Sequence, residues 1–190
     1  MTTHTVLGSQ LSALGLSERQ SAVAGTLGFV LALAAASQVA IPLLGTPVPI
    51  TLQPLIVVLA GMMLGPTLGT TSMLLYLAIG AAGVPVFAPM GAPGIARFFG
   101  PTGGYLIAYP AAAALAGWLA QRYPTLVGRW LAAMAGIAML FVGGLSQLTI
   151  LTGSVGRAVA LGITPFAVFD IVKAFVAALI ARPRSRSTPE

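Results

Sequence analysis

The chain has 190 residues, of which 57% are hydrophobic and only 6% are charged, and its formal net charge is +6. Soluble globular domains carry about 25% charged residues, so this composition excludes an ordinary soluble enzyme. No charged side chain occurs between Arg19 and Arg97. Since a helix that crosses the hydrocarbon needs about 20 apolar residues, this long run indicates a polytopic helical membrane protein. Stretches such as 28–37 lack the alternation of a transmembrane β-barrel.

Six membrane spans are predicted along the chain, separated by stretches rich in proline and glycine. They are residues 21–43, 54–64, 69–83, 104–121, 130–152 and 165–181. Pro47 and Pro49 forbid regular helix after the first span. The sequence GPTLG (65–69) predicts a turn between the second and third spans. Segment 85–104 has too much proline and glycine for a helix, so we expect a folded loop or re-entrant segment there. The predicted fold class is an all-α, single-domain membrane bundle of six transmembrane helices.

The two ends of the chain are predicted to be cytosolic tails, residues 1–20 and 182–190, on either side of the transmembrane domain 21–181. The first tail lacks the basic start of a cleaved signal peptide. Six spans place both termini on one side, together with Arg19, Arg122, Arg129, Arg182, Arg184 and Arg186, and leave Arg97 and Arg157 on the other. By the positive-inside rule both termini are cytoplasmic. Loops 44–53, 84–103 and 153–164 then face outside, where we expect the functional site.

Two ionisable side chains lie inside a predicted span. Asp170 and Lys173 are three residues apart and therefore share one face of a helix. Ionisable groups in a membrane usually face a bundle interior or a watered cavity, which makes this pair a candidate for ligand binding. The alternative is a self-satisfied ion pair that only fixes helix packing.

Arg97 is the third charged candidate and precedes GPTGGY (100–105) in an outer loop. The alternative is an exposed arginine at the membrane border. If Arg97 lines the same cavity as Asp170 and Lys173, the three charges sum to about +1 at neutral pH. Such a site favours a small monoanion such as a carboxylate, because arginine binds it through two hydrogen bonds and lysine as a point charge.

Four polar side chains are placed to complete such a site with hydrogen bonds and apolar walls: Gln53, Tyr76, Tyr105 and Tyr109. For each of them, core packing or an interfacial aromatic belt is the alternative. On the first span, Ala32, Ala36 and Ala40 recur at intervals of four. Small residues at this spacing let two helices approach closely in lipid, either in a partner interface or within the bundle.

Several chemical functions lack their residues in this sequence. There is no GxxxxGK[ST] phosphate loop, no HExxH or GxSxG motif, no cysteine and no pair of carboxylates on neighbouring spans. We therefore expect no enzymatic activity, no metal site and no cofactor. Because the basic residues gather at span ends, we expect no nucleic-acid binding either. Ligand binding or passive conduction remains, with any energy supplied by a partner.

The motifs PVPITLQP (47–54), GPTGGYL within 76–110, and FDIVKA (169–174) resemble the BioY family, the biotin-binding S components of energy-coupling factor transporters. The resemblance covers about residues 20–182. It implies a six-helix protein of the bacterial cell membrane that binds biotin from the outer side. It also implies a transmembrane coupling T component and two cytosolic ATPases as partners, which would account for the missing phosphate loop.

Carried onto this sequence, the ligand-binding charges of the family fall on Arg97, Asp170 and Lys173, and its coupling surface falls on Ala32, Ala36 and Ala40. Segment 88–96 lacks the polar amide that family members carry nearby, which leaves Gln53 or a backbone group to replace that hydrogen bond, or the bond absent. The sequence thus predicts a substrate-binding subunit for biotin uptake. A non-transporting scaffold with structural charges and a small channel remain as alternatives.

Overall fold

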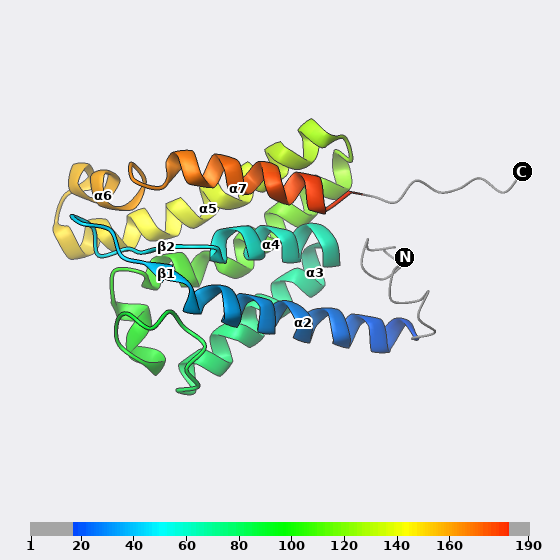
Figure 1. The fold of residues 1–190 in the computed structure, drawn as a ribbon, viewed down its shortest axis with the longest axis horizontal. Helices are drawn as coiled ribbons and strands as arrows, with labels where there is room; N and C mark the ends of the chain where they lie inside the picture. Colours follow the sequence, from blue (N-terminus) through cyan, green and yellow to red (C-terminus); the bar gives the residue numbers. More distant parts are fainter. Residues whose placement is uncertain (1–16, 183–190) are drawn as a thin grey trace, which may run out of the picture.

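The computed structural model describes residues 17–182, which are mostly helical (Figure 1). Most of the predicted tails 1–20 and 182–190 lie outside the described residues. The elements in chain order are α2 (Glu18–Gln38), β1 (Ala40–Ile41), β2 (Ile50–Thr51), α3 (Gln53–Ala81), the 3₁₀ helix η1 (Gly94–Phe99), α4 (Gly103–Arg122), α5 (Leu126–Thr152), α6 (Val155–Gly162) and α7 (Ala167–Ile180).

Helix α3 is broken at Gly65 into two helical segments, 53–64 and 66–81. Gly65 has φ 82° and ψ 170°, a conformation that glycine reaches without steric penalty. Pro66, which has no N–H to donate, suits the first turn of the second segment. The turn predicted at 65–69 is therefore present but shorter, because the helix resumes at Pro66.

The two segments of α3 run antiparallel and touch each other. The side-chain nitrogen of Gln53 donates a hydrogen bond to the Tyr76 hydroxyl over 3.1 Å. A straight helix would separate these two residues by about 35 Å, so the chain must fold back between them. The segments cross closely where Gly69 meets Gly61, since a Cβ on Gly69 would lie 2.7 Å from the Gly61 Cα. Small residues permit this approach in lipid.

Helix α4 packs against both α3 and α5. A Cβ on Gly117 of α4 would lie 2.5 Å from the Gly61 carbonyl oxygen of α3. On the other side, a Cβ on Gly136 of α5 would lie 3.0 Å from the Ala112 carbonyl oxygen of α4. Both seams therefore depend on glycine, which lets the helix backbones approach directly.

Within residues 17–182, four helices are long and apolar enough to cross a membrane, and the pair α6 and α7, bent by 54°, brings the number to five. This criterion counts α3 once, although α3 folds back at Gly65. The start of α2 and the end of α7 lie at one end of the bundle, and α6 and the β1–β2 hairpin lie at the other (Figure 1). The architecture is that of a multi-pass helical membrane protein.

The first predicted span is too long at its carboxyl end. Helix α2 ends at Gln38, and β1 then pairs antiparallel with β2, with Ala40 opposite Thr51. Pro42 keeps the residue before it out of the helical region, which favours this extended chain. The prediction that Ala40 continues the alanine row of the helix is therefore wrong, since only Ala32 and Ala36 lie on α2.

Two predicted outer loops contain short helices. The 3₁₀ helix η1 lies within 85–104, and α6 lies within 153–164. Helix α6 begins where the Ser154 hydroxyl accepts a hydrogen bond from the Arg157 backbone N–H over 3.4 Å. The prediction that segment 85–104 contains no helix is therefore too strict, since η1 forms a short 3₁₀ helix there, although without a side-chain cap.

Candidate ligand-binding site

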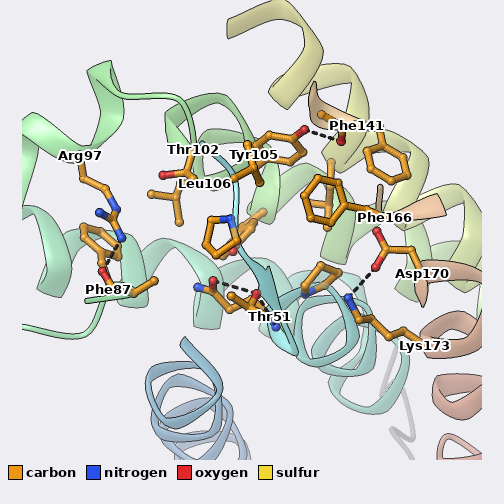
Figure 2. A pocket seen from close by; sticks show the side chains of 18 residues that line it. Thr51, Phe87, Arg97, Thr102, Tyr105, Leu106, Phe141, Phe166, Asp170 and Lys173 are labelled. Atoms are coloured by element: carbon orange, nitrogen blue, oxygen red, sulfur yellow. Dashed lines mark hydrogen bonds and ion pairs between the residues drawn. The ribbon is translucent and has the colours of Figure 1, made fainter. Parts of the chain in front are cut away.

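A cavity opens at the end of the bundle that carries the β1–β2 hairpin and α6, and Figure 2 shows its lining side chains. The empty space amounts to about 700 Å³ when the open mouth is included. All three predicted outer loops contribute walls, among them Val48, Thr51, Phe87, Ala88, Arg97 and Gly162. Helices α3, α4, α5 and α7, together with Phe166 just before α7, supply the rest of the lining.

Arg97 lies at one side of this cavity and is buried, with 4% of its surface exposed. Its Nη1 donates to the carbonyl oxygen of Met90 and its Nη2 to that of Ala88. Burial lowers the pKa of the Arg97 guanidinium, which nevertheless stays a cation at neutral pH. Among the residues that the structure describes, Arg97 forms no salt bridge. The alternative of an exposed loop arginine is therefore wrong.

Gly91 makes room for the Arg97 side chain. It has φ +115°, and a Cβ at this position would overlap Nη1 of Arg97. Any other residue at position 91 would strain the backbone and displace the guanidinium. The glycine-rich composition of segment 85–104 is thus partly explained by the need to enclose an arginine.

Asp170 and Lys173 line the opposite side of the cavity in Figure 2. Lys173 Nζ donates to Asp170 Oδ1 over 2.7 Å, and the side chains are only 10% and 6% exposed, respectively. Both residues lie on α7, one turn apart, as their spacing predicts. The pair is nearly neutral as a unit, so the positive charge without a counter-charge in this cavity belongs to Arg97.

Gln53 forms part of the cavity wall and is held by two neighbours. Its Oε1 accepts from the Thr51 hydroxyl over 3.2 Å, and its Nε2 donates to the hydroxyl of Tyr76, which is fully buried. Tyr109 also lines the cavity and stacks on Tyr76 at a centroid distance of 6.3 Å. Its hydroxyl forms no hydrogen bond within residues 17–182, so it is available to a ligand.

Tyr105 lines the cavity but uses its hydroxyl elsewhere. The hydroxyl donates to the Gly162 carbonyl oxygen over 2.8 Å and so ties α4 to the end of α6. The ring lies over Gly144, where a Cβ would overlap it. Tyr105 therefore offers a ligand its ring and its oxygen lone pairs, because its proton is occupied.

The sequence did not identify the apolar walls of the cavity. Phe87, Phe141 and Phe166 line it, and no charge or polar spacing marks these three phenylalanines as cavity residues. Phe169, on α7 and three residues after Phe166, is 53% exposed. In an apolar span, a phenylalanine that faces a cavity and one that faces lipid have the same local sequence signal.

Ala32 and Ala36, the two alanines of the predicted row that lie on α2, are not part of the cavity lining. Ala36 is buried within the chain, with 9% of its surface exposed, and Ala32 is half-buried. Helix α2 packs against α3. In the isolated chain, Ala36 therefore packs within the bundle, which was the alternative to a partner interface. Ala32 keeps part of its surface accessible.

Comparisons with known proteins agree with this architecture. The model of the BioY family matches residues 9–190. The "Probable biotin transporter BioY" of Pyrococcus horikoshii is 44% identical over 135 residues, which are 71% of this chain and 79% of that protein. The "Biotin transporter BioY" of Thermotoga maritima is 36% identical over 135 residues, with the same coverage of 71% and 79%.

A solved structure is also similar, the S-component for biotin from an ECF-type ABC transporter. It matches with a TM-score of 0.80 and 25% identity, over 88% of this chain and 93% of that chain. The relatives are described as transporters and not as enzymes. Because the family model matches nearly the whole sequence, this chain belongs to the BioY family.

Proposed function

We propose that this chain is the substrate-binding membrane subunit for biotin uptake and captures biotin from the outer side of the membrane. The observation that carries the proposal is the cavity lined by Arg97, Asp170 and Lys173 in a chain whose relatives are named biotin transporters. The site residues proposed to bind the ligand are Arg97, Asp170, Lys173, Gln53 and Tyr105. The protein has no enzymatic activity of its own.

The topology proposed for this function has six membrane crossings, cytoplasmic termini and a location in the bacterial cell membrane. Counting segments 53–64 and 66–81 of α3 separately, and α6 with α7 as one bent span, gives this number. The basic residues Arg122, Arg129 and Arg182 then lie at the cytoplasmic end, which supports the orientation. The cavity accordingly faces outward.

The polar groups of the cavity suit the two ends of biotin. A ureido head presents N–H donors beside a carbonyl acceptor, which complements the adjacent acceptor and donor of Asp170 and Lys173. The valerate carboxylate suits Arg97, whose charge is held by neutral carbonyls rather than by a carboxylate. The aromatic walls then enclose the apolar middle of the ligand.

Partners supply the energy in this proposal. The chain has no phosphate loop, so ATP hydrolysis belongs to two cytosolic ATPases, coupled through a transmembrane T component. Ala32, which is half-buried and lies one turn before the buried Ala36, marks the proposed partner interface on α2. Close approach of small side chains is what brings two helices together in lipid.

Thermal unfolding of the purified full-length chain in detergent tests the function. Biotin at about 100 times its dissociation constant should stabilise a binder by about 2.7 kcal/mol. A scaffold or a channel that does not bind biotin should gain nothing. Acetate at the same concentration is the control for a non-specific carboxylate. Equal melting temperatures with and without saturating biotin would contradict the proposal.

Biotin methyl ester tests the orientation of the ligand. Arg97→Met should weaken binding of biotin about 10- to 100-fold, since a hydrogen bond to a charged group contributes about 1.5–3 kcal/mol. The same variant should leave binding of the ester nearly unchanged. Lys173→Met should weaken both ligands alike. If Lys173→Met instead removes the preference for the acid, the carboxylate lies at α7.

A further inference from the structure

A polar network outside the cavity holds the segment that precedes Arg97. Ser37, near the end of α2, is fully buried, and its Oγ lies 2.6 Å from the Val86 carbonyl oxygen. The Tyr76 hydroxyl donates to the same carbonyl over 2.9 Å. Gln38 Nε2 donates to the Phe87 carbonyl oxygen over 3.2 Å and to Ser37 Oγ over 2.9 Å. Two helices therefore fix two consecutive carbonyls of a non-helical segment.

This segment continues directly into the groups that orient Arg97. Phe87 and Ala88 line the cavity, and the Ala88 carbonyl oxygen accepts from Arg97 Nη2. Only Phe87 separates Val86 from Ala88, so a shift of the Val86 carbonyl moves the acceptor that holds the guanidinium. Arg97 reaches these carbonyls on a long side chain that would otherwise sample many rotamers.

Hydrogen bonds within helix α2 do not account for the network. Ser37 Oγ also lies 2.7 Å from the Ala34 carbonyl oxygen, the ordinary local partner of a serine in a helix. A serine that bonded only within its own helix would donate its single hydroxyl proton to Ala34 and would not need to approach the Val86 carbonyl. Gln38 is exposed, yet its amide lies against the same segment rather than extending away from the protein.

We propose that Ser37 and Gln38 are positioning residues for the ligand carboxylate and act through the 86–88 segment on Arg97. The inference rests on the proposed function, because it requires the carboxylate of biotin at Arg97. Binding a carboxylate through two parallel hydrogen bonds needs a guanidinium of fixed plane. A neutral ester has neither the charge nor the two equivalent oxygens of a carboxylate, so its affinity should not depend on the network.

Equilibrium binding of biotin and of biotin methyl ester to the full-length chain in detergent tests this role. Ser37→Ala and Gln38→Met should each weaken biotin about two- to tenfold, the range that one net hydrogen bond provides. Both variants should leave affinity for the ester unchanged. Ser146→Ala is the matched control, since Ser146 is an exposed helical serine whose Oγ donates to the Val142 carbonyl oxygen over 2.8 Å. It should change neither affinity.

The difference between acid and ester separates a positioning role from a structural one. Equal losses for both ligands, or unchanged affinity for biotin in both variants, would overturn the proposal. If Ser37→Ala does not fold, Gln38→Met decides alone, because its side chain is exposed. If the unmodified chain binds acid and ester equally, the biotin carboxylate does not bind Arg97, and the positioning role is wrong as well. If the unmodified chain discriminates and both variants keep its full discrimination, only the positioning role fails.

Discussion

Gly61 in α3 lies so close to Ala113 in α4 that no side chain fits between them. A Cβ on Gly61 would overlap the Ala113 carbonyl oxygen. Gly69, in the second segment of α3, also packs against Gly61. Gly117 of α4 lies close to the Gly61 carbonyl oxygen. Three helical segments therefore touch through their backbones at one point. This contact keeps the α3 hairpin and α4 together and so supports the cavity above it.

Gly61→Ala should lower the stability of the chain by about 1–3 kcal/mol, because an added methyl in a close-packed site forces the backbones apart. Melting of the purified variant in detergent measures this. Gly28→Ala is the matched control, since Gly28 is an exposed helical glycine with nothing within 4 Å of its Cβ position. Alanine there should be neutral or stabilising by up to about 1 kcal/mol. Equal melting temperatures of the two variants would argue against the contact.

Lys173→Met should destabilise the unliganded chain by about 3–5 kcal/mol, because it leaves the carboxylate of Asp170 buried without a partner. The double variant Asp170→Leu/Lys173→Met should be closer to the unmodified protein in stability and should still fail to bind biotin. Melting curves and biotin binding on the same samples check both statements. A double variant that binds biotin normally would show that the pair serves packing alone.

Tyr105→Phe should lower stability by about 1 kcal/mol, since it removes the hydrogen bond to the Gly162 carbonyl. Biotin affinity should change by less than about threefold, because the ring that lines the cavity is kept. Tyr123→Phe, at an exposed tyrosine, is the control and should be neutral. A large loss of affinity without a loss of stability would mean that the hydroxyl contacts the ligand.

Ala36→Trp should destabilise the isolated chain, because Ala36 is buried and a large ring overpacks its site. Ala32→Trp should leave folding and biotin binding intact but reduce assembly with the coupling component, because Ala32 is half-buried on the proposed interface. Melting curves and pull-down of the partner subunits, read together, measure the two effects. Normal assembly of a folded Ala32→Trp variant would move the interface elsewhere.

The purified chain should hydrolyse no ATP above background, because its sequence has no phosphate-cradling loop. A phosphate-release assay before and after addition of the coupling component and ATPases measures this. Activity should appear only with the ATPases. Hydrolysis that copurifies with this chain through a second column would refute the assignment of energy to partners.

The sequence alone determined the membrane class, the approximate positions of most helices and the three charged residues that line the cavity. Lipid excludes charge and unpaired backbone, so long uncharged runs between arginines define helices with little dependence on tertiary context. Because charge is costly in lipid, Asp170 and Lys173 were identified as candidates within a predicted span. Arg97 was identified as the charged residue of a loop rich in proline and glycine.

Tertiary structure decided what depends on close approach between distant segments. The break of α3 at Gly65 is local, but the antiparallel contact of Gly61 with Gly69 follows from backbone packing that glycine permits and no periodicity records. The early end of α2 depends on β1 pairing with a strand ten residues away. The cavity walls depend on which face of an apolar helix turns inward. Lipid and protein interior both accept a phenylalanine, so only the packing of the helices separates Phe166 from Phe169.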